Sequence, residues 1–178
     1  MNASQAHNIL INKDEIREGV EALSGRIAED IKGEPTILVA LLKGSVVFLS
    51  DLMRGLCARG VSPEVDFMMP SSYKNSRVSS EEIEIQLDIT SPVEGKTVLI
   101  VDDIIDTGVT LAAVKERIAA KKPARILTCA LLDKPARRKI DIKADYTAFT
   151  IGDVFVVGYG LDLAGRHRCL PYIAEALE

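Results

Sequence analysis

Residues 98–111 read VLIVDDIIDTGVTL, and this stretch decides the fold. Its first four residues are apolar, which is typical of a strand buried on both faces of a sheet. The carboxylates of Asp102 and Asp103 follow directly, and a third carboxylate comes at Asp106. Small and hydroxyl-bearing residues then open a helix, which we expect to run from about residue 107 to residue 120. The stretch therefore predicts a strand, an acidic turn and a helix in direct succession.

The start of that helix has the composition of a phosphate-binding turn. Backbone N–H groups at a helix start lack partners within the helix, Gly108 lets a ligand approach closely, and Thr107 and Thr110 add two hydroxyl groups. Carboxylates beside a phosphate would repel it, unless they hold hydroxyl groups or a hard cation such as Mg²⁺. We therefore expect a phosphorylated sugar as the ligand. Helix capping by Asp103 and Thr107 would account for one or two of these residues, but not for all of them.

Outside this stretch the chain alternates between helical and strand patterns. Apolar residues between Ile16 and Ile31 recur at steps of three and four, which predicts an amphipathic helix, and Asn12 with Glu15 resembles a capping box at its start. Ser45 is expected to cap a second helix. Apolar or alternating runs predict strands at residues 37–42, 64–69, 83–87, 97–101, 125–132, 146–149 and 155–159. This order indicates an α/β fold with a central, largely parallel sheet flanked by helices, and ligands then bind at the carboxyl ends of the strands.

The composition limits the classes of function. A chain of 178 residues fits a single domain over residues 1–178. Its formal net charge of −4 disfavours a generic nucleic-acid binder, and the absence of both a long apolar run and a basic, apolar leader disfavours a membrane or secreted protein. We therefore expect neither nucleic acid nor membrane as a partner. Three widely spaced cysteines are typical of a reduced, cytoplasmic protein without a zinc site, and Cys57 and Cys129 are expected in the core.

The stretch 98–111 resembles the phosphoribosyl pyrophosphate (PRPP) site of the type I phosphoribosyltransferases. Further segments look like the hypoxanthine–guanine phosphoribosyltransferases, and most like the bacterial enzymes. These segments are LLKGS at 41–45, VDF at 65–67, SSY at 71–73, LDKP at 132–135 and FVVGYGLD at 155–162. The resemblance covers about residues 8–174. The PRPP motif alone indicates the superfamily, whereas the segments at Lys134 and Phe155 point to a 6-oxopurine substrate.

The resemblance implies an enzyme of purine salvage. Family members transfer the 5-phosphoribosyl group of PRPP to N9 of hypoxanthine, and of guanine as well, which forms IMP or GMP and releases pyrophosphate. Asp102 and Asp103 would face the ribose hydroxyls and stabilise the positive charge of an oxocarbenium-like transition state. Asp106 would also act as general base or acid at purine N7. The 5′-phosphate would bind to Asp106, Thr107, Gly108, Val109 and Thr110.

Pyrophosphate would bind to two loops of the chain. Lys43 and Gly44 match the family's pyrophosphate loop, which contains a non-proline cis peptide, here expected between Leu42 and Lys43. Arg168 would reach the same group from the C-terminal part of the chain. Without the resemblance, Lys43 would be interpreted as a solvated surface lysine.

The purine would be held by two further segments. Lys134 would donate a hydrogen bond to the purine 6-oxygen, which disfavours adenine because adenine carries an amino donor there. Phe155 would stack on the base, Val156 would bond it through main-chain groups, and Asp162 would lie near the purine 2-position. The alternatives are core packing for Phe155 and a basic exposed turn for Lys134. Mg²⁺ is the cofactor that the resemblance implies, with Asp162, Asp102 and Asp103 as its ligands.

A serine-rich loop at about residues 71–80 matches the lid of the family. The lid would begin with Ser72 and Tyr73, close over the site and exclude water. A small hood would form from about residues 1–12 and 150–178, and the family assembles as homodimers or homotetramers. Three lid residues depart from the common bacterial pattern and leave the lid's dynamics open: Lys74, Arg77 and Val78.

Other interpretations of the same residues are weaker or remain open. The receiver domain of signalling proteins also has a strand that ends in two aspartates, but there the pair lies near the start of the domain and a further aspartate ends the next strand. A regulator that senses PRPP and binds nucleic acid would keep the phosphate turn, yet it needs a basic face. A xanthine-preferring transferase is not distinguished by Lys134, because xanthine also carries the 6-oxygen.

Overall fold

A six-stranded sheet forms the centre of the computed structural model, which describes residues 8–72 and 83–176. The strand order is β4 (Ile83–Leu87), β3 (Glu64–Ser72), β2 (Thr36–Leu41), β5 (Thr97–Ile105), β6 (Arg125–Asp133) and β7 (Tyr146–Thr150). Neighbouring strands are parallel, except that β4 pairs antiparallel with β3 at one edge. The predicted α/β fold with a largely parallel sheet is therefore confirmed.

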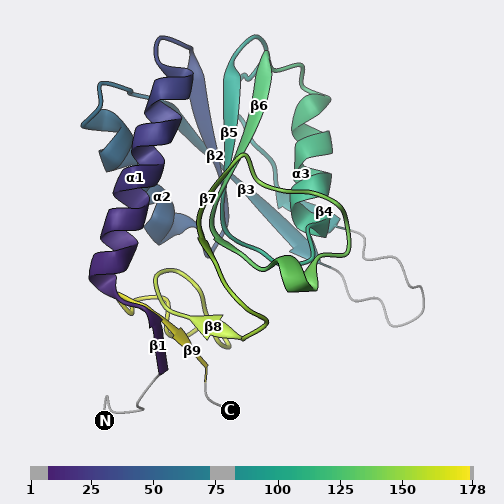
Figure 1. The fold of residues 1–178 in the computed structure, drawn as a ribbon. Helices are drawn as coiled ribbons and strands as arrows, with labels where there is room; N and C mark the ends of the chain where they lie inside the picture. Colours follow the sequence, from purple (N-terminus) through teal and green to yellow (C-terminus); the bar gives the residue numbers. More distant parts are fainter. Residues whose placement is uncertain (1–7, 73–82, 177–178) are drawn as a thin grey trace, which may run out of the picture.

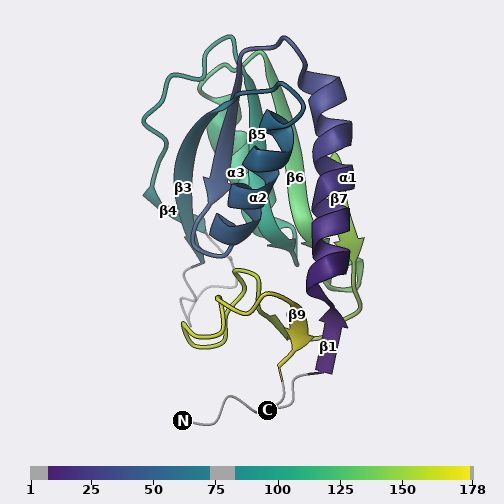
Figure 2. The ribbon, with the colours of Figure 1, turned by 90° about the vertical axis from the view of Figure 1, so that its left-hand side faces the viewer.

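Helices cover both faces of this sheet (Figures 1 and 2). On one face lie α1 (Lys13–Ile31) and α2 (Val46–Cys57), and on the other lies α3 (Val109–Ala119). The helices and the two sheet faces enclose two apolar cores, one that includes Phe48 and one that includes Val114. The central strand β2 is buried along its whole length, because both of its faces are covered. No helix of the described residues is long and apolar enough to cross a membrane.

A second, small sheet is built from both ends of the described chain. Its strand order is β1 (Asn8–Ile11), β9 (Ile173–Glu175) and β8 (Val156–Val157), with antiparallel pairing throughout. Figure 2 shows this sheet beyond the main sheet, next to the N-terminal end of α1. We call β1 together with residues 151–176 the hood. The carboxyl ends of the parallel strands point toward the hood, so a ligand bound at the strand ends would lie against it.

Local sequence signals predict the starts of α1 and α2 correctly, but only α1 has the expected side-chain cap. The Asn12 side chain accepts hydrogen bonds from the N–H groups of Asp14 and Glu15, and the Glu15 carboxylate accepts one from Asn12 N–H, so the capping box is confirmed. The cap expected at Ser45 is wrong. The Ser45 hydroxyl donates to the carbonyl of Leu41 at 2.6 Å, and it thereby ties the start of α2 to the end of β2.

Two further expectations are wrong in their details. Cys57 is exposed at the end of α2, whereas Cys129 is buried as expected. The strand expected at 155–159 shortens to β8, because Gly158 and Tyr159 have φ angles of 98° and 48° and turn the chain. In both cases the residues lie in an apolar stretch of sequence, but such a stretch does not determine which side chain is buried or where a strand ends.

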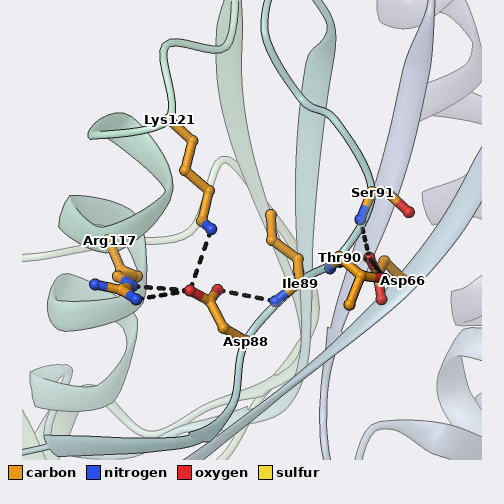
Figure 3. A network of polar contacts seen from close by, with 7 residues as sticks. All are labelled: Asp66, Asp88, Ile89, Thr90, Ser91, Arg117 and Lys121. Atoms are coloured by element: carbon orange, nitrogen blue, oxygen red, sulfur yellow. Dashed lines mark hydrogen bonds and ion pairs between the residues drawn. The ribbon is translucent and has the colours of Figure 1, made fainter.

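The carboxylates of Asp66 and Asp88 hold the segment that leads into β5 in place through hydrogen bonds (Figure 3). Asp66 on β3 accepts hydrogen bonds from the N–H groups of Thr90 and Ser91, each at 2.8 Å. Asp88 accepts two hydrogen bonds from the guanidinium of Arg117 on α3, at 2.8 and 3.0 Å. The connection between β4 and β5 is therefore held to both a strand and a helix.

Candidate active site

The two adjacent aspartates lie on β5 itself and not after it. β5 continues past the predicted end at Val101, because its ladder with β6 extends to the pairing of Ile105 with Asp133. Asp102 is buried and Asp103 is half-buried, and Asp103 N–H donates to Asp102 Oδ1 at 3.0 Å. The longer ladder fixes both carboxylates on a rigid strand.

The surroundings of this pair disfavour its charged form. Burial raises the pKa of the Asp102 carboxyl well above its ordinary value, and the neighbouring charge of Asp103 raises it further. Burial also raises the pKa of Asp103, and the positive charge of Arg168 opposes this effect. A buried carboxylate beside a half-buried one suits a ligand that brings hydrogen-bond donors or positive charge.

The turn after β5 presents backbone groups to a cleft. Gly108 has a φ of 86°, in the left-handed region that favours glycine, and a Cβ at this position would lie 2.6 Å from the side chain of Ile142. α3 begins at Val109, two residues later than predicted, and Val109 N–H donates to the hydroxyl of Thr107 at 3.4 Å. The other N–H groups of the first helical turn lack intrahelical partners, so they are available to an anion.

The loop after β6 holds this turn in place. The Arg138 guanidinium donates to the carbonyl of Asp106 at 2.6 Å and ion-pairs with the carboxylate of Asp133. The carbonyl of Thr107 accepts a hydrogen bond from Lys139 N–H at 2.9 Å. Arg138 was not among the predicted site residues, because a basic run directly after a strand is typical of an exposed turn.

The loop between β2 and α2 forms another wall of the cleft. The peptide bond between Leu42 and Lys43 is cis, as the resemblance implies. The Lys43 side chain is exposed, whereas Gly44 is buried and a Cβ on it would collide with the carboxylate of Asp103. Position 44 must therefore lack a side chain for the loop to approach β5 so closely.

Arg168 reaches the same cleft from the hood. Its guanidinium pairs with one oxygen of Asp162 at 2.6 Å and donates to the carbonyl of Gly160 at 2.7 Å. The other oxygen of Asp162 accepts a hydrogen bond from Gly165 N–H at 2.7 Å. Both oxygens of Asp162 thus already have partners within the hood, and the carboxylate orients Arg168.

These parts enclose one cleft of about 330 Å³. Its walls come from the ends of β2 and β5, the turn before α3, and the hood. Val109, Lys134, Phe155 and Val156 do not line it. The predicted site residues that do line it are Lys43, Gly44, Asp102, Asp103, Asp106, Thr107, Gly108, Thr110, Asp162 and Arg168.

The residues predicted to hold a purine belong to neighbouring segments. Lys134 is buried, its N–H donates to the carbonyl of Ile105 at 2.9 Å, and its ammonium donates to the carbonyl of Val154 at 2.8 Å. Phe155 is 57% exposed, so the alternative of core packing is wrong. Val156 lies in the edge strand β8, whose outward backbone groups do not face β9. The buried ammonium thus bonds the residue that directly precedes the exposed Phe155 and the edge strand β8.

The predicted lid falls mostly outside the described residues. Ser72 is the last residue of β3, which extends further than the expected end at residue 69, so the loop does not begin at residue 71. Tyr73, Lys74, Arg77 and Val78 lie outside the described residues.

The fold and the cleft together define a class of protein. A turn with N–H groups that suit a phosphate, two adjacent acids that suit sugar hydroxyls, and the cations Lys43 and Arg168 lie at the carboxyl ends of a parallel sheet. A sugar that carries two separate phosphate groups matches this order, as in the phosphoribosyltransferases.

Comparison with known proteins gives the family. The family model for the phosphoribosyl transferase domain matches residues 6–163. The chain is 43% identical over 170 residues to the hypoxanthine-guanine phosphoribosyltransferase of Streptococcus pneumoniae strain R6, covering 96% of this chain and 93% of that protein. It is 42% identical over 171 residues to the hypoxanthine phosphoribosyltransferase of Escherichia coli K12, covering 95% and 94%. The chain belongs to the hypoxanthine(-guanine) phosphoribosyltransferase family.

Solved structures agree with this assignment. A crystal structure of a hypoxanthine-guanine phosphoribosyltransferase from Bacillus anthracis matches with a TM-score of 0.90 at 40% identity, covering 96% of this chain and 98% of that one. A hypoxanthine phosphoribosyltransferase from Staphylococcus aureus matches with a TM-score of 0.88 at 39% identity, covering 94% and 90%. The relatives and this chain thus share one architecture over nearly their whole length.

Proposed function

We propose that this chain transfers the 5-phosphoribosyl group from PRPP to N9 of hypoxanthine, and of guanine, to form IMP or GMP and pyrophosphate. The observation that supports this most directly is that the turn before α3, the two adjacent aspartates on β5 and the Lys43–Gly44 loop line one cleft. Each of these parts suits a different part of PRPP. The names of the relatives from S. pneumoniae and E. coli support hypoxanthine and guanine as the acceptor bases.

The donor half of the site would bind and activate PRPP. The turn from Asp106 to Thr110 would hold the 5′-phosphate through backbone N–H groups and hydroxyls. Asp102 and Asp103 would accept hydrogen bonds from the ribose hydroxyls. As the bond from C1′ to the diphosphate breaks, positive charge grows on the sugar, and these fixed carboxylates would stabilise it without reorganisation.

Two cations of the cleft would receive the leaving group. Lys43 and Arg168 both line the cleft, and they come from the loop between β2 and α2 and from the hood respectively. Their positive charges would stabilise pyrophosphate as negative charge develops on it. Because Asp162 and the Gly160 carbonyl both bond the Arg168 guanidinium, that side chain is oriented before the substrate arrives.

The acceptor half would select and hold the purine. The buried Lys134 ammonium would donate to the 6-oxygen, and Phe155 would stack on the ring. Outward main-chain groups at Val156 would bond the base edge, with Asp162 near the purine 2-position. Asp106 would accept or return the proton at N7 while N9 forms the bond to C1′.

Mg²⁺ is the cofactor that the donor set fits, on the condition that the substrate supplies part of the coordination. Among the residues that the structure describes, no three or more His, Cys, Asp or Glu side chains lie together as a metal site. Asp102 and Asp103 provide adjacent carboxylates at the cleft, and Mg²⁺ is commonly held by one or two carboxylates, waters and substrate phosphates. The bound ion would neutralise charge on the diphosphate. Asp162, which already pairs with Arg168, would reach the ion through water.

Several features of the proposal concern the rest of the molecule. Residues 1–178 would act as one domain, with a lid at about residues 71–80 that begins at Ser72 and Tyr73. Assembly as a homodimer or homotetramer and a cytoplasmic location also stay predictions.

The proposed activity is tested by mixing the protein with Mg²⁺, PRPP and each of five bases: hypoxanthine, guanine, xanthine, adenine and uracil. Nucleotide formation is followed by absorbance. We expect IMP and GMP to form, and no product from adenine or uracil. A product from xanthine alone would contradict the proposed acceptor, and no product from any base would contradict the proposed activity.

A further inference from the structure

A series of ion pairs connects Lys134, on the base side of the site, to Asp106. The Lys134 ammonium lies 3.7 Å from Asp153 Oδ1. Nη1 of Arg137 lies 3.5 Å from the same oxygen, and Nε of Arg137 lies 3.3 Å from Asp106 Oδ1. One oxygen of Asp153 therefore contacts two cations, and one guanidinium contacts two acids.

At the Lys134 end of this series of ion pairs, the ammonium is buried and already has partners within the protein. Only 7% of its side chain is exposed, and a buried ammonium is costly unless it is paired. An ammonium has three N–H donors, of which one bonds the carbonyl of Val154 and a second can face Asp153. One donor is therefore left for a purine 6-oxygen.

The Asp106 end is held differently. Its Oδ1 atom is buried and lacks a hydrogen-bond partner, although Arg137 Nε is close. Arg137 therefore attracts this oxygen by charge without occupying its lone pairs in a well-formed hydrogen bond. An oxygen in this state can still accept a hydrogen bond from a ligand, but it is drawn toward Arg137.

We propose that Asp153 and Arg137 are positioning residues that make the availability of Asp106 depend on the base that Lys134 binds. This inference rests on the proposed function. When a 6-oxo base accepts a hydrogen bond from Lys134, the ammonium shares its charge with the base and its attraction to Asp153 weakens. Asp153 then pairs more strongly with Arg137, and Arg137 releases Asp106 toward purine N7.

The first test changes Asp153, which is 53% exposed at its side chain and is therefore open to substitution without loss of the fold. We expect Asp153→Asn to raise the KM for hypoxanthine about tenfold, because Lys134 loses a charged partner. The KM for PRPP should stay unchanged, and Asp153→Glu should restore part of the loss. The matched control is Asp14→Asn, which removes an exposed acid that pairs with Arg17 on α1.

The second test asks whether the two residues act as a unit. Arg137→Gln is combined with Asp153→Asn, and kcat/KM for hypoxanthine is measured for both single variants and the double variant. We expect kcat/KM of the double variant to fall by much less than the product of the two single losses, since either change interrupts the same series of ion pairs. Single losses that multiply to within about twofold would overturn the inference.

The outcomes separate this inference from the proposed function. If the unchanged protein forms no IMP from PRPP and hypoxanthine, the proposed function itself fails. If the unchanged protein is active and Asp153→Asn leaves the KM for hypoxanthine unchanged, only the positioning role fails. Thermal unfolding of each variant confirms that the protein remains folded.

Discussion

Asp106 is the residue on which the chemistry of the proposed reaction most depends. Asp106→Asn keeps the shape of the side chain and removes its ability to take up a proton. We expect kcat to fall about 10²–10⁴-fold, the typical contribution of a general base or acid. The KM for PRPP should change little, because in the proposed mechanism the backbone N–H groups of the turn, and not this carboxylate, bind the phosphate. Steady-state kinetics with hypoxanthine measure both values, and normal turnover would exclude the proton-transfer role.

Lys134 is the residue that we propose distinguishes the 6-oxygen of a purine from an amino group. We expect Lys134→Ala to lower the ratio of kcat/KM for hypoxanthine over adenine about tenfold or more, because a buried donor facing another donor costs about 1–3 kcal/mol. Lys143→Ala is the control, since Lys143 is an exposed lysine in the same part of the chain. An unchanged ratio in Lys134→Ala would remove this lysine from base selection.

Which residues of the site can be predicted depends on how far apart in sequence their partners lie. Asp102 and Thr107 belong to one continuous stretch, so their role follows from a local pattern of strand, acids and helix start. Phe155 could be identified only by resemblance, since an apolar run does not reveal which side chain stays exposed. Arg138 bonds the carbonyl of Asp106 across 32 positions, and no periodicity predicts such a contact.

At the scale of elements, the periodicity of hydrophobic residues predicts where a strand lies, but not which strand it pairs with or in which direction. The strand at 83–87 was predicted with the correct bounds, yet its antiparallel pairing with β3 depends on the course of the chain between them. β5 is longer than its apolar run, because β6 offers partners as far as Asp133. Polar residues therefore lie on a strand where sequence patterns predict a turn, and at this position they form part of the site.

Asp66 and Asp88 make the connection between β4 and β5 sensitive to acid (Figure 3). Burial raises the pKa of Asp66, but hydrogen bonds from Ser91, Phe67 and Thr90 outweigh it, so the pKa is lowered overall. Burial likewise raises the pKa of Asp88, but Arg117 and Lys121 outweigh it and lower the pKa. A lowered pKa in the folded state means that the folded protein favours the charged form more than the unfolded chain does. The stabilisation is complete above the ordinary Asp value of 3.8 and is lost as the pH falls through the folded-state pKa.

The corresponding prediction concerns Asp88→Asn. We expect this change to lower the free energy of unfolding at pH 7, where the unchanged protein has a charged Asp88. The difference between the two proteins should shrink as the pH falls below about 3.8, where the unfolded chain begins to bind a proton at Asp88, and it should vanish below the lowered folded-state pKa. Urea unfolding between pH 7 and pH 3 measures this difference. A difference of the same size at both ends of the range would show that charge at Asp88 does not stabilise the fold.

At the scale of the whole molecule, the site is shared between the main sheet and the hood. The main sheet carries the acids and the phosphate turn, whereas the hood carries Asp162 and Arg168. The two parts meet where Gly160 packs on the carbonyl of Gly44, so closely that a Cβ on Gly160 would collide with it. The relative position of hood and sheet therefore decides whether Arg168 can act on a ligand held by β5.

Gly160→Ala tests this dependence on the position of the hood. Gly160 has a φ of 103°, its carbonyl accepts a hydrogen bond from Arg168, and a Cβ has no room beside Gly44. We expect the hood to move away from the Lys43–Gly44 loop and the KM for PRPP to rise about 10–100-fold, as a displaced binding group would cause. Gly60→Ala is the control, because Gly60 has a φ of 80° with open space around it. It carries the same kind of backbone strain without the collision, so equal KM values for PRPP in both variants would show that the hood's position does not govern binding.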